Sequence, residues 1–267
     1  MSKKKNAVIW TSSIVGVLVI AVLLGLIFTG LYIGWGPFTY LQFDQQEKAI
    51  VNKYDAKTRK NEIIFYGASN FRLWTEMDND LSEYKVQNHG FGGCTDKDLV
   101  ARADTLLYPY EPQVVFFQTG SNDYVSLSGT DEEKTTKCID YKKEMFSTFR
   151  EKLPNAYFVL MSGLLLPGRS QYTDLKKKIN SELKTLCSSS DYMYFVDAGS
   201  MTFDGNNYRE DLFREDKIHL NHDGELLWCK DYIKPEIASL IEEHNLTGQL
   251  ESCAFREENC QKRLILS

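Results

Sequence analysis

The chain has 267 residues, of which 43% are hydrophobic and 25% charged, and its formal net charge is −6 at pH 7. This composition is ordinary for a globular protein, and the length is enough for one sizeable domain with a full core. The acidic balance and the lack of a basic patch exclude a typical nucleic-acid-binding protein. We therefore expect one globular domain whose partners do not include nucleic acid.

The first 35 residues differ in composition from the rest. Lys3, Lys4 and Lys5 precede an uncharged run whose most apolar part extends from Ile14 to Trp35. At 1.5 Å per residue, a helix of this length spans a hydrocarbon core of about 30 Å. A cleaved signal peptide is the alternative, but its apolar region is shorter and ends at a small-residue cleavage site, which this segment lacks. We predict that residues 1–35 form a cytoplasmic N-terminus and one transmembrane helix.

The distribution of positive charge predicts the orientation of this anchor. Three lysines precede the apolar span, and no lysine or arginine follows it until Lys48. The positive-inside rule therefore places the N-terminus in the cytoplasm and the rest of the chain outside. The expected localisation is the cell membrane, with a single-pass anchor and an extracellular domain.

All six cysteines lie beyond the apolar span, where an oxidising compartment can pair them. Six cysteines allow fifteen pairings, and the sequence does not choose among them. Cys253 and Cys260 are close together in a short polar tail, so they are the first candidates for a bridge. The cysteine spacing does not resemble that of a zinc site.

After the anchor, the sequence predicts a connecting helix within residues 36–60, a domain over 61–244 and a C-terminal tail over 245–267. Within the domain, five short apolar runs alternate with helical stretches. This alternation predicts a parallel β-sheet covered by helices on both faces. The runs are residues 62–67, 84–90, 113–120, 156–163 and 192–199. In such sheets, ligands bind at the carboxyl ends of the strands.

Residues suited to acyl transfer follow these predicted strand ends. Ser69 can act as a nucleophile or, as the alternative for this stretch alone, as a helix cap. His219 can act as the general base, and Asp216, three residues earlier, can orient its imidazole ring. The N–H of Gly90 and the side-chain amide of Asn122 can stabilise an oxyanion.

Four sequence blocks in this order resemble those of the SGNH hydrolases, also called GDSL-type esterases. The blocks read GASN, NHGFGG, GSND and DKIH, and the resemblance extends over about residues 62 to 235. The resemblance implies a three-layer, flavodoxin-like α/β fold with a five-stranded parallel sheet. It also implies hydrolysis of esters or related acyl groups.

The sequence departs from the family pattern at three positions. Ala68 stands where the family name has an acidic residue, His89 replaces an arginine, and Cys94 replaces a serine. In the branch that the sequence resembles most, serine is frequent at the first position, so the alanine there does not argue against catalysis. The other two replacements are expected to alter the pocket wall.

The sequence therefore predicts a membrane-anchored serine esterase that needs neither a metal nor another cofactor. Ser69 attacks the acyl carbonyl, and His219, oriented by Asp216, accepts the proton. The N–H groups of Ser69 and Gly90 and the side chain of Asn122 form the oxyanion hole. The expected substrate is a small or glycan-linked ester with a short acyl group, such as acetyl. The alternatives are an acyltransferase acting on surface glycans and a catalytically silent binding module at the cell surface.

Overall fold

The computed structural model describes residues 15–27, 38–246 and 249–252. By its internal contacts, the chain divides into two units, Met1–Ala49 and Ile50–Ser267. The larger unit contains the whole β-sheet and all the predicted site residues.

Residues 15–27 are helical, and their large apolar side chains are exposed. Within the described part of the chain, no helix combines the length and the apolar character needed to cross a membrane. The predicted span also includes residues 14 and 28–35, which lie outside the described residues.

The connecting segment forms helix α2, Phe38–Lys53. This helix ends earlier than the predicted connection, because the chain turns at Asp55. The backbone carbonyl of Asp55 accepts hydrogen bonds from the N–H groups of Thr58 and Arg59, and its carboxylate accepts one from Lys57 N–H. A side chain that bonds to nearby backbone groups in this way competes with continuation of a helix.

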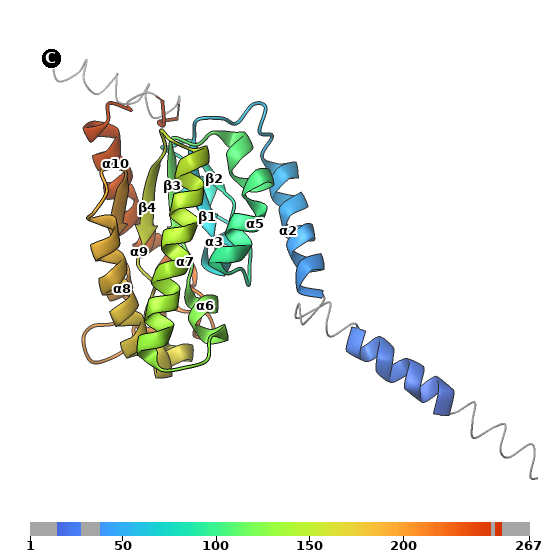
Figure 1. Ribbon diagram of the computed structural model, residues 1–267. Helices are drawn as coiled ribbons and strands as arrows, with labels where there is room; N and C mark the ends of the chain where they lie inside the picture. The colour runs from blue at the N-terminus through green and yellow to red at the C-terminus, as the bar shows by residue number, and fades with distance from the viewer. Residues whose placement is uncertain (1–14, 28–37, 247–248, 253–267) are drawn as a thin grey trace, which may run out of the picture. The chain divides into compact units, whose positions relative to one another are not determined.

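The domain is built on a five-stranded sheet with the order β2-β1-β3-β4-β5, and every adjacent pair is parallel (Figure 1). The strands are β1 (Ile63–Gly67), β2 (Val86–Asn88), β3 (Val114–Gln118), β4 (Tyr157–Met161) and β5 (Met193–Val196). The chain order changes direction between β1 and β3, and such a switch point opens a crevice at the carboxyl ends of the strands. The predicted parallel sheet is confirmed, and each strand lies within its predicted run.

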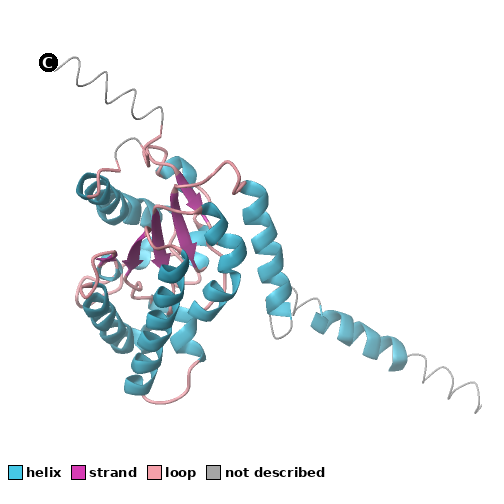
Figure 2. Cartoon of the chain, turned by 45° about the horizontal axis from the view of Figure 1, so that its top comes forward, coloured by secondary structure: helices cyan, strands magenta, loops and turns pink. Residues whose placement is uncertain are grey.

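Helices cover both faces of the sheet (Figure 2), as expected for strands buried on both sides. Successive strand residues point to opposite faces. On one face, the rings of Phe65 and Phe116 stack at 4.8 Å and pack with Phe71 in one core cluster. On the other face, Phe117 stacks on Phe149 at 5.6 Å. This arrangement gives the three layers of the predicted α/β fold.

The helices of the domain follow the strands in chain order. The α-helices are α3 (Ser69–Leu73), α4 (Met77–Asp80), α5 (Asp96–Leu106), α6 (Ser121–Ser126), α7 (Asp131–Lys152), α8 (Thr173–Cys187), α9 (His222–Trp228) and α10 (Lys234–Glu243). Shorter turns are η1 (Tyr108–Tyr110), η2 (Pro167–Tyr172), η3 (Gly199–Thr202), η4 (Glu210–Leu212) and the π-helical η5 (Cys229–Ile233). Capping boxes begin α5 at Thr95 and α7 at Thr130.

Four cysteines of the described part are buried, and each has a free thiol. They are Cys94, Cys138, Cys187 and Cys229. Burial raises the pKa of each of these thiols, as expected for inert core residues. The predicted bridge between Cys253 and Cys260 lies outside the described residues.

Candidate active site

Ser69 lies at the carboxyl end of β1, where the strand turns directly into α3. Ala68 occupies the N-cap position and donates its N–H to the carbonyl of Gln118 on β3 at 3.0 Å. Ser69 is the first residue of the helix, so its N–H has no acceptor within the helix. The Ser69 hydroxyl therefore does not cap the helix. The backbone N–H of Ser69 belongs to the first turn of α3.

The hydroxyl of Ser69 contacts His219, which in turn contacts Asp216. The Oγ of Ser69 lies 2.8 Å from Nε2 of His219, and Nδ1 of His219 lies 2.7 Å from Oδ2 of Asp216. A nucleophile within hydrogen-bond distance of a base, which is itself oriented by a carboxylate, has the geometry of a Ser-His-Asp triad. The structure thus brings together the three residues that the sequence assigned to catalysis.

The Asp216 carboxylate is held in its ionised form. Partial burial alone would raise its pKa, but hydrogen bonds from the His219 ring and from the N–H groups of His219 and Ile218 outweigh this effect. The net result is a pKa below the ordinary value of an aspartate. Its Oδ1 accepts both N–H groups at 2.9 Å, which leaves Oδ2 for the imidazole. A carboxylate in this state can stabilise the imidazolium that forms during acyl transfer.

Two polar side chains fix the loop that carries His219 against the helix that carries Ser69. Asn70 Oδ1 accepts the N–H of Leu220 at 3.2 Å. Arg214 donates to the carbonyl of Leu220 at 2.8 Å and to the carbonyl of Leu73, at the end of α3, at 2.9 Å. These bonds hold the base beside the nucleophile without help from a ligand.

Asn122 lies in the first turn of α6, next to the end of β3. Its Nδ2 donates to the carbonyl of Cys94 at 2.9 Å, and its Oδ1 lies 3.5 Å from Nη2 of Arg169. The amide nitrogen carries a second hydrogen that the Cys94 contact does not use. This hydrogen remains available for an oxyanion.

Gly90 follows β2 and lies directly against α3. A Cβ at this position would meet the backbone nitrogen of Arg72 at 2.4 Å and Cβ of Phe71 at 2.6 Å, so only glycine fits there. Its N–H donates to Oδ1 of Asn88 at 3.0 Å. Gly90 therefore packs against the helix that begins at Ser69, and an oxyanion would have to share this N–H with Asn88 or displace Asn88 from it.

His89 and Cys94, which we expected to alter the pocket wall, lie in the protein interior instead. His89 is fully buried, its Nδ1 donates to the carbonyl of Leu106 at 2.6 Å, and burial lowers its pKa to about 4. Cys94 is also fully buried and contacts the site through its backbone carbonyl. Both residues follow a strand end, where the sequence alone does not distinguish an inward from an outward side chain.

Among residues 15–27, 38–246 and 249–252, no three His, Cys, Asp or Glu side chains gather in a way that could hold a metal ion. The sequence analysis also missed two features. One is Arg169, in the loop after β4. The other is a buried ionic cluster under α6, in which Lys142 contacts Asp96 at 2.5 Å and Asp96 N–H donates to Asp123 at 3.1 Å. The acidic residue beside Asn122 in the third block was the available signal for this cluster.

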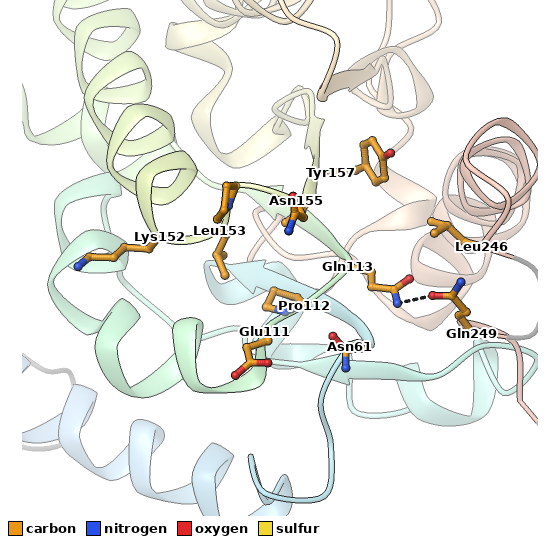
Figure 3. Close-up of a pocket in the computed structure, with 12 residues that line it drawn as sticks. Asn61, Glu111, Pro112, Gln113, Lys152, Leu153, Asn155, Tyr157, Leu246 and Gln249 are labelled. Atoms are coloured by element: carbon orange, nitrogen blue, oxygen red, sulfur yellow. Dashed lines mark hydrogen bonds between the residues drawn. The ribbon is translucent and has the colours of Figure 1, made fainter.

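A separate pocket of about 420 Å³ lies at the opposite edge of the sheet (Figure 3). Its lining includes Asn61, Gln113 and Tyr157, which precede or begin β1, β3 and β4. Gln113 and Gln249 are joined across it by a hydrogen bond of 2.6 Å (Figure 3). This pocket is at the amino ends of the strands, whereas Ser69 and Asn122 follow the carboxyl ends.

Comparison with known sequences identifies the family of the chain. The sequence model of the GDSL-like lipase/acylhydrolase family matches residues 63–227, which contain the site residues described above. The chain belongs to this family. It is thus a GDSL-type hydrolase, in agreement with the resemblance of its four sequence blocks. No curated protein sequence matches the chain significantly.

Several solved structures share the fold of this chain. A protein described as a platelet activating factor from Streptococcus pneumoniae has a TM-score of 0.62 at 16% identity, covering 79% of this chain and 97% of that chain. A proposed acylhydrolase from Bacteroides fragilis has a TM-score of 0.58 at 16% identity, covering 78% and 98%. An acetyl-xylooligosaccharide esterase from Geobacillus, in mutant form, has a TM-score of 0.51 at 17% identity, covering 64% and 91%. At these identities the similarity establishes the fold alone.

Proposed function

We propose that this GDSL-type hydrolase is a serine esterase that removes short acyl groups, acetyl among them, from small or carbohydrate-linked esters. The observation that carries the proposal is the continuous contact from Ser69 Oγ through the His219 ring to the Asp216 carboxylate. It is found at the carboxyl edge of the parallel sheet, where such folds bind their ligands.

The reaction follows from the positions of these groups. Ser69 Oγ attacks the ester carbonyl while Nε2 of His219 accepts its proton. The N–H of Ser69 and the free amide hydrogen of Asn122 stabilise the oxyanion, with Gly90 N–H as a third donor if it leaves Asn88. The imidazolium then protonates the leaving alcohol, and an acyl-enzyme remains. Water, activated by His219, attacks the acyl-enzyme and releases the acid.

Labelling with a fluorophosphonate probe tests the nucleophile directly. We expect the full-length chain to label, the Ser69→Ala variant not to label, and the variant of an exposed serine, Ser200→Ala, to label as the wild type does. A silent binding module at the cell surface would leave the wild type unlabelled. The hydrolysis of model esters by the wild-type protein that has not been treated with the probe then separates an esterase from an acyltransferase that requires an alcohol acceptor.

The preference for short acyl groups rests on the loops around the site. The loop between β3 and α7 carries only the short α6, and the loop between β4 and α8 carries only the short η2. Neither is a long apolar helix able to cover an acyl chain. Each CH₂ group that an enzyme buries contributes about 0.8 kcal/mol, so a site without an apolar trough gains little from longer chains. We expect kcat/KM for acetyl or butyryl esters to exceed that for palmitoyl esters. A steady rise from acetate to palmitate would indicate a lipid substrate instead.

The membrane anchor and the extracellular position of the domain are part of the proposal. They rest on the apolar segment from Ile14 to Trp35 and on the lysines that precede it. We expect protease added to intact cells to remove the domain. Protection in intact cells that is lost on lysis would place the domain inside.

A further inference from the structure

Arg169 belongs to η2, and residues on both sides of it in this turn make contacts that hold it beside Asn122. On one side, Gly168 N–H donates to the carbonyl of Lys217, in the loop that carries His219, at 2.8 Å. A Cβ on Gly168 would lie 2.9 Å from the carbonyl oxygen of Asp216, so the two segments are in close contact. On the other side, the ring of Tyr172 packs on Tyr124 of α6 at 5.3 Å.

The guanidinium group of Arg169 faces polar groups of α6. Its Nη2 lies 3.5 Å from Oδ1 of Asn122. Burial raises the pKa of Tyr124, and the positive charge of Arg169 counteracts part of this rise. Tyr124 in turn donates to Oγ of Ser121 at 3.4 Å. The guanidinium of Arg169 and the hydroxyl of Ser121 thus both lie close to Asn122 or next to it in the chain.

This cation lacks a carboxylate partner. Within residues 15–27, 38–246 and 249–252, Arg169 forms no ion pair, although the domain carries an excess of acidic side chains. Two further cations lie close to the tyrosines that flank Arg169. Lys176 Nζ is 4.7 Å from the centroid of the Tyr124 ring, and Lys134 Nζ is 5.2 Å from that of the Tyr172 ring. Asp96 and Asp123 of the buried cluster under α6 also act on Lys176 and offset part of this positive charge.

We propose that Arg169, with the hydroxyl group of Ser121, binds a carboxylate or phosphate group carried by the ester substrate. A guanidinium presents several N–H donors in a planar arrangement that fits the oxygens of either group. The proposal rests on the proposed esterase function and narrows it to esters that carry an anionic group close to the scissile bond.

The kinetic test compares matched esters. The anionic substrates are 4-acetoxybenzoate and 4-acetoxyphenyl phosphate, and the neutral one is 4-acetoxybenzamide. We expect the full-length chain to cleave at least one anionic ester with a kcat/KM about tenfold above the neutral ester, because charge-assisted hydrogen bonds are the stronger kind. Which anion is preferred distinguishes a carboxylate from a phosphate site.

The variants separate recognition of the anion from a general effect on catalysis. Arg169→Gln should lower kcat/KM for the preferred anionic ester about tenfold, mainly through KM, and leave the neutral ester nearly unchanged. Arg169→Lys, which keeps the charge but not the planar donors, should retain part of the preference. Lys60→Gln removes the same charge from the opposite edge of the sheet, where Lys60 pairs with Glu111, and should change neither rate. Equal losses for anionic and neutral esters in Arg169→Gln, or no anionic preference in the wild type, would overturn the proposal.

A binding measurement keeps this inference separate from the proposed function. We expect phenyl phosphate or benzoate to bind the full-length chain in calorimetry, about tenfold more weakly to Arg169→Gln and equally to Lys60→Gln. If the chain cleaves no ester but this pattern is found, the esterase proposal fails and the anion site stands. If both probes bind all three proteins equally or bind none of them, the anion site is refuted whatever the chain hydrolyses.

Discussion

Nε2 of His219 lies 2.8 Å from Oγ of Ser69, although 150 positions of the chain separate the two residues. One side chain begins α3 and the other belongs to a loop near the C-terminal end of the domain. The distance is within the range for proton transfer from a nucleophile to a base.

The Ser69→Ala substitution should abolish ester hydrolysis because it removes the hydroxyl group. The fold should persist, because residue 69 is not the N-cap of α3 and the helix loses no capping bond. Steady-state kinetics with 4-nitrophenyl acetate, together with circular dichroism, check both parts. Retained turnover in a purified, folded variant would remove Ser69 from the role of nucleophile.

The Asp216→Asn substitution should lower kcat by roughly 10³- to 10⁴-fold with little change in fold. The amide oxygen can still accept the N–H groups of Ile218 and His219, but the amide nitrogen would then donate to Nδ1 of His219. This interaction favours the tautomer with its proton on Nε2, which cannot accept the proton of Ser69. The measurement is kcat at neutral pH, and a loss of less than about tenfold would show that the carboxylate does not orient the base.

The Asn122→Ala substitution should lower kcat by roughly 10²- to 10³-fold, the usual effect of losing one oxyanion donor. KM should change little, because the developing charge is greatest in the transition state. Asn79→Ala, in which an exposed asparagine is truncated, serves as the matched control and should behave as the wild type. If the rate changes less than threefold in Asn122→Ala, its role is limited to the contact with Cys94.

The buried carboxyl group of Asp123 gives a prediction about stability and pH. Burial, reinforced by the nearby charge of Asp96, raises its pKa to about 6. The folded protein then binds a proton more tightly than the unfolded chain, so this group stabilises the fold at acidic pH. That contribution is lost as pH rises from the unfolded-state value of about 3.9 through the folded-state value.

The Asp123→Asn variant should therefore become more stable relative to the wild type as the pH rises from 4.5 to 7. The relative gain is on the order of 2 kcal/mol in the free energy of unfolding. Urea denaturation of both proteins at the two pH values measures it, and Asp140→Asn provides an exposed control. A difference that is constant with pH would show that Asp123 is ionised throughout this range, and a change in the opposite direction would contradict its raised pKa.

Much of the fold and of the triad could be predicted from the sequence because the relevant signals are local. Each strand is a short apolar run bounded by turn residues, and the parallel order follows from the alternation with helices. Ser69, Asn122 and His219 were found because they follow strand ends or lie in the last loop, where a parallel sheet collects its functional residues.

Other features could not be predicted because they depend on contacts between distant segments. The bond from Gly90 N–H to Asn88 and the burial of His89 are set by how the end of β2 packs against α3 and α5. Arg169 lies in a loop with no periodic pattern, and its place beside Asn122 depends on Gly168 and Tyr172 at once. Asp123 and Lys142 join the same buried cluster from separate helices.

The bonds that Arg214 and Asn70 make between α3 and the loop of His219 also bear on when the protein becomes reactive during its synthesis. Ser69 leaves the ribosome early, but its hydroxyl has no base until the segment up to Leu220 has been made and has docked on α3. A nascent or truncated chain that ends before this segment carries a serine of ordinary, low reactivity. In the proposed mechanism, activation of Ser69 is therefore coupled to completion of the domain, and incomplete chains would not hydrolyse esters.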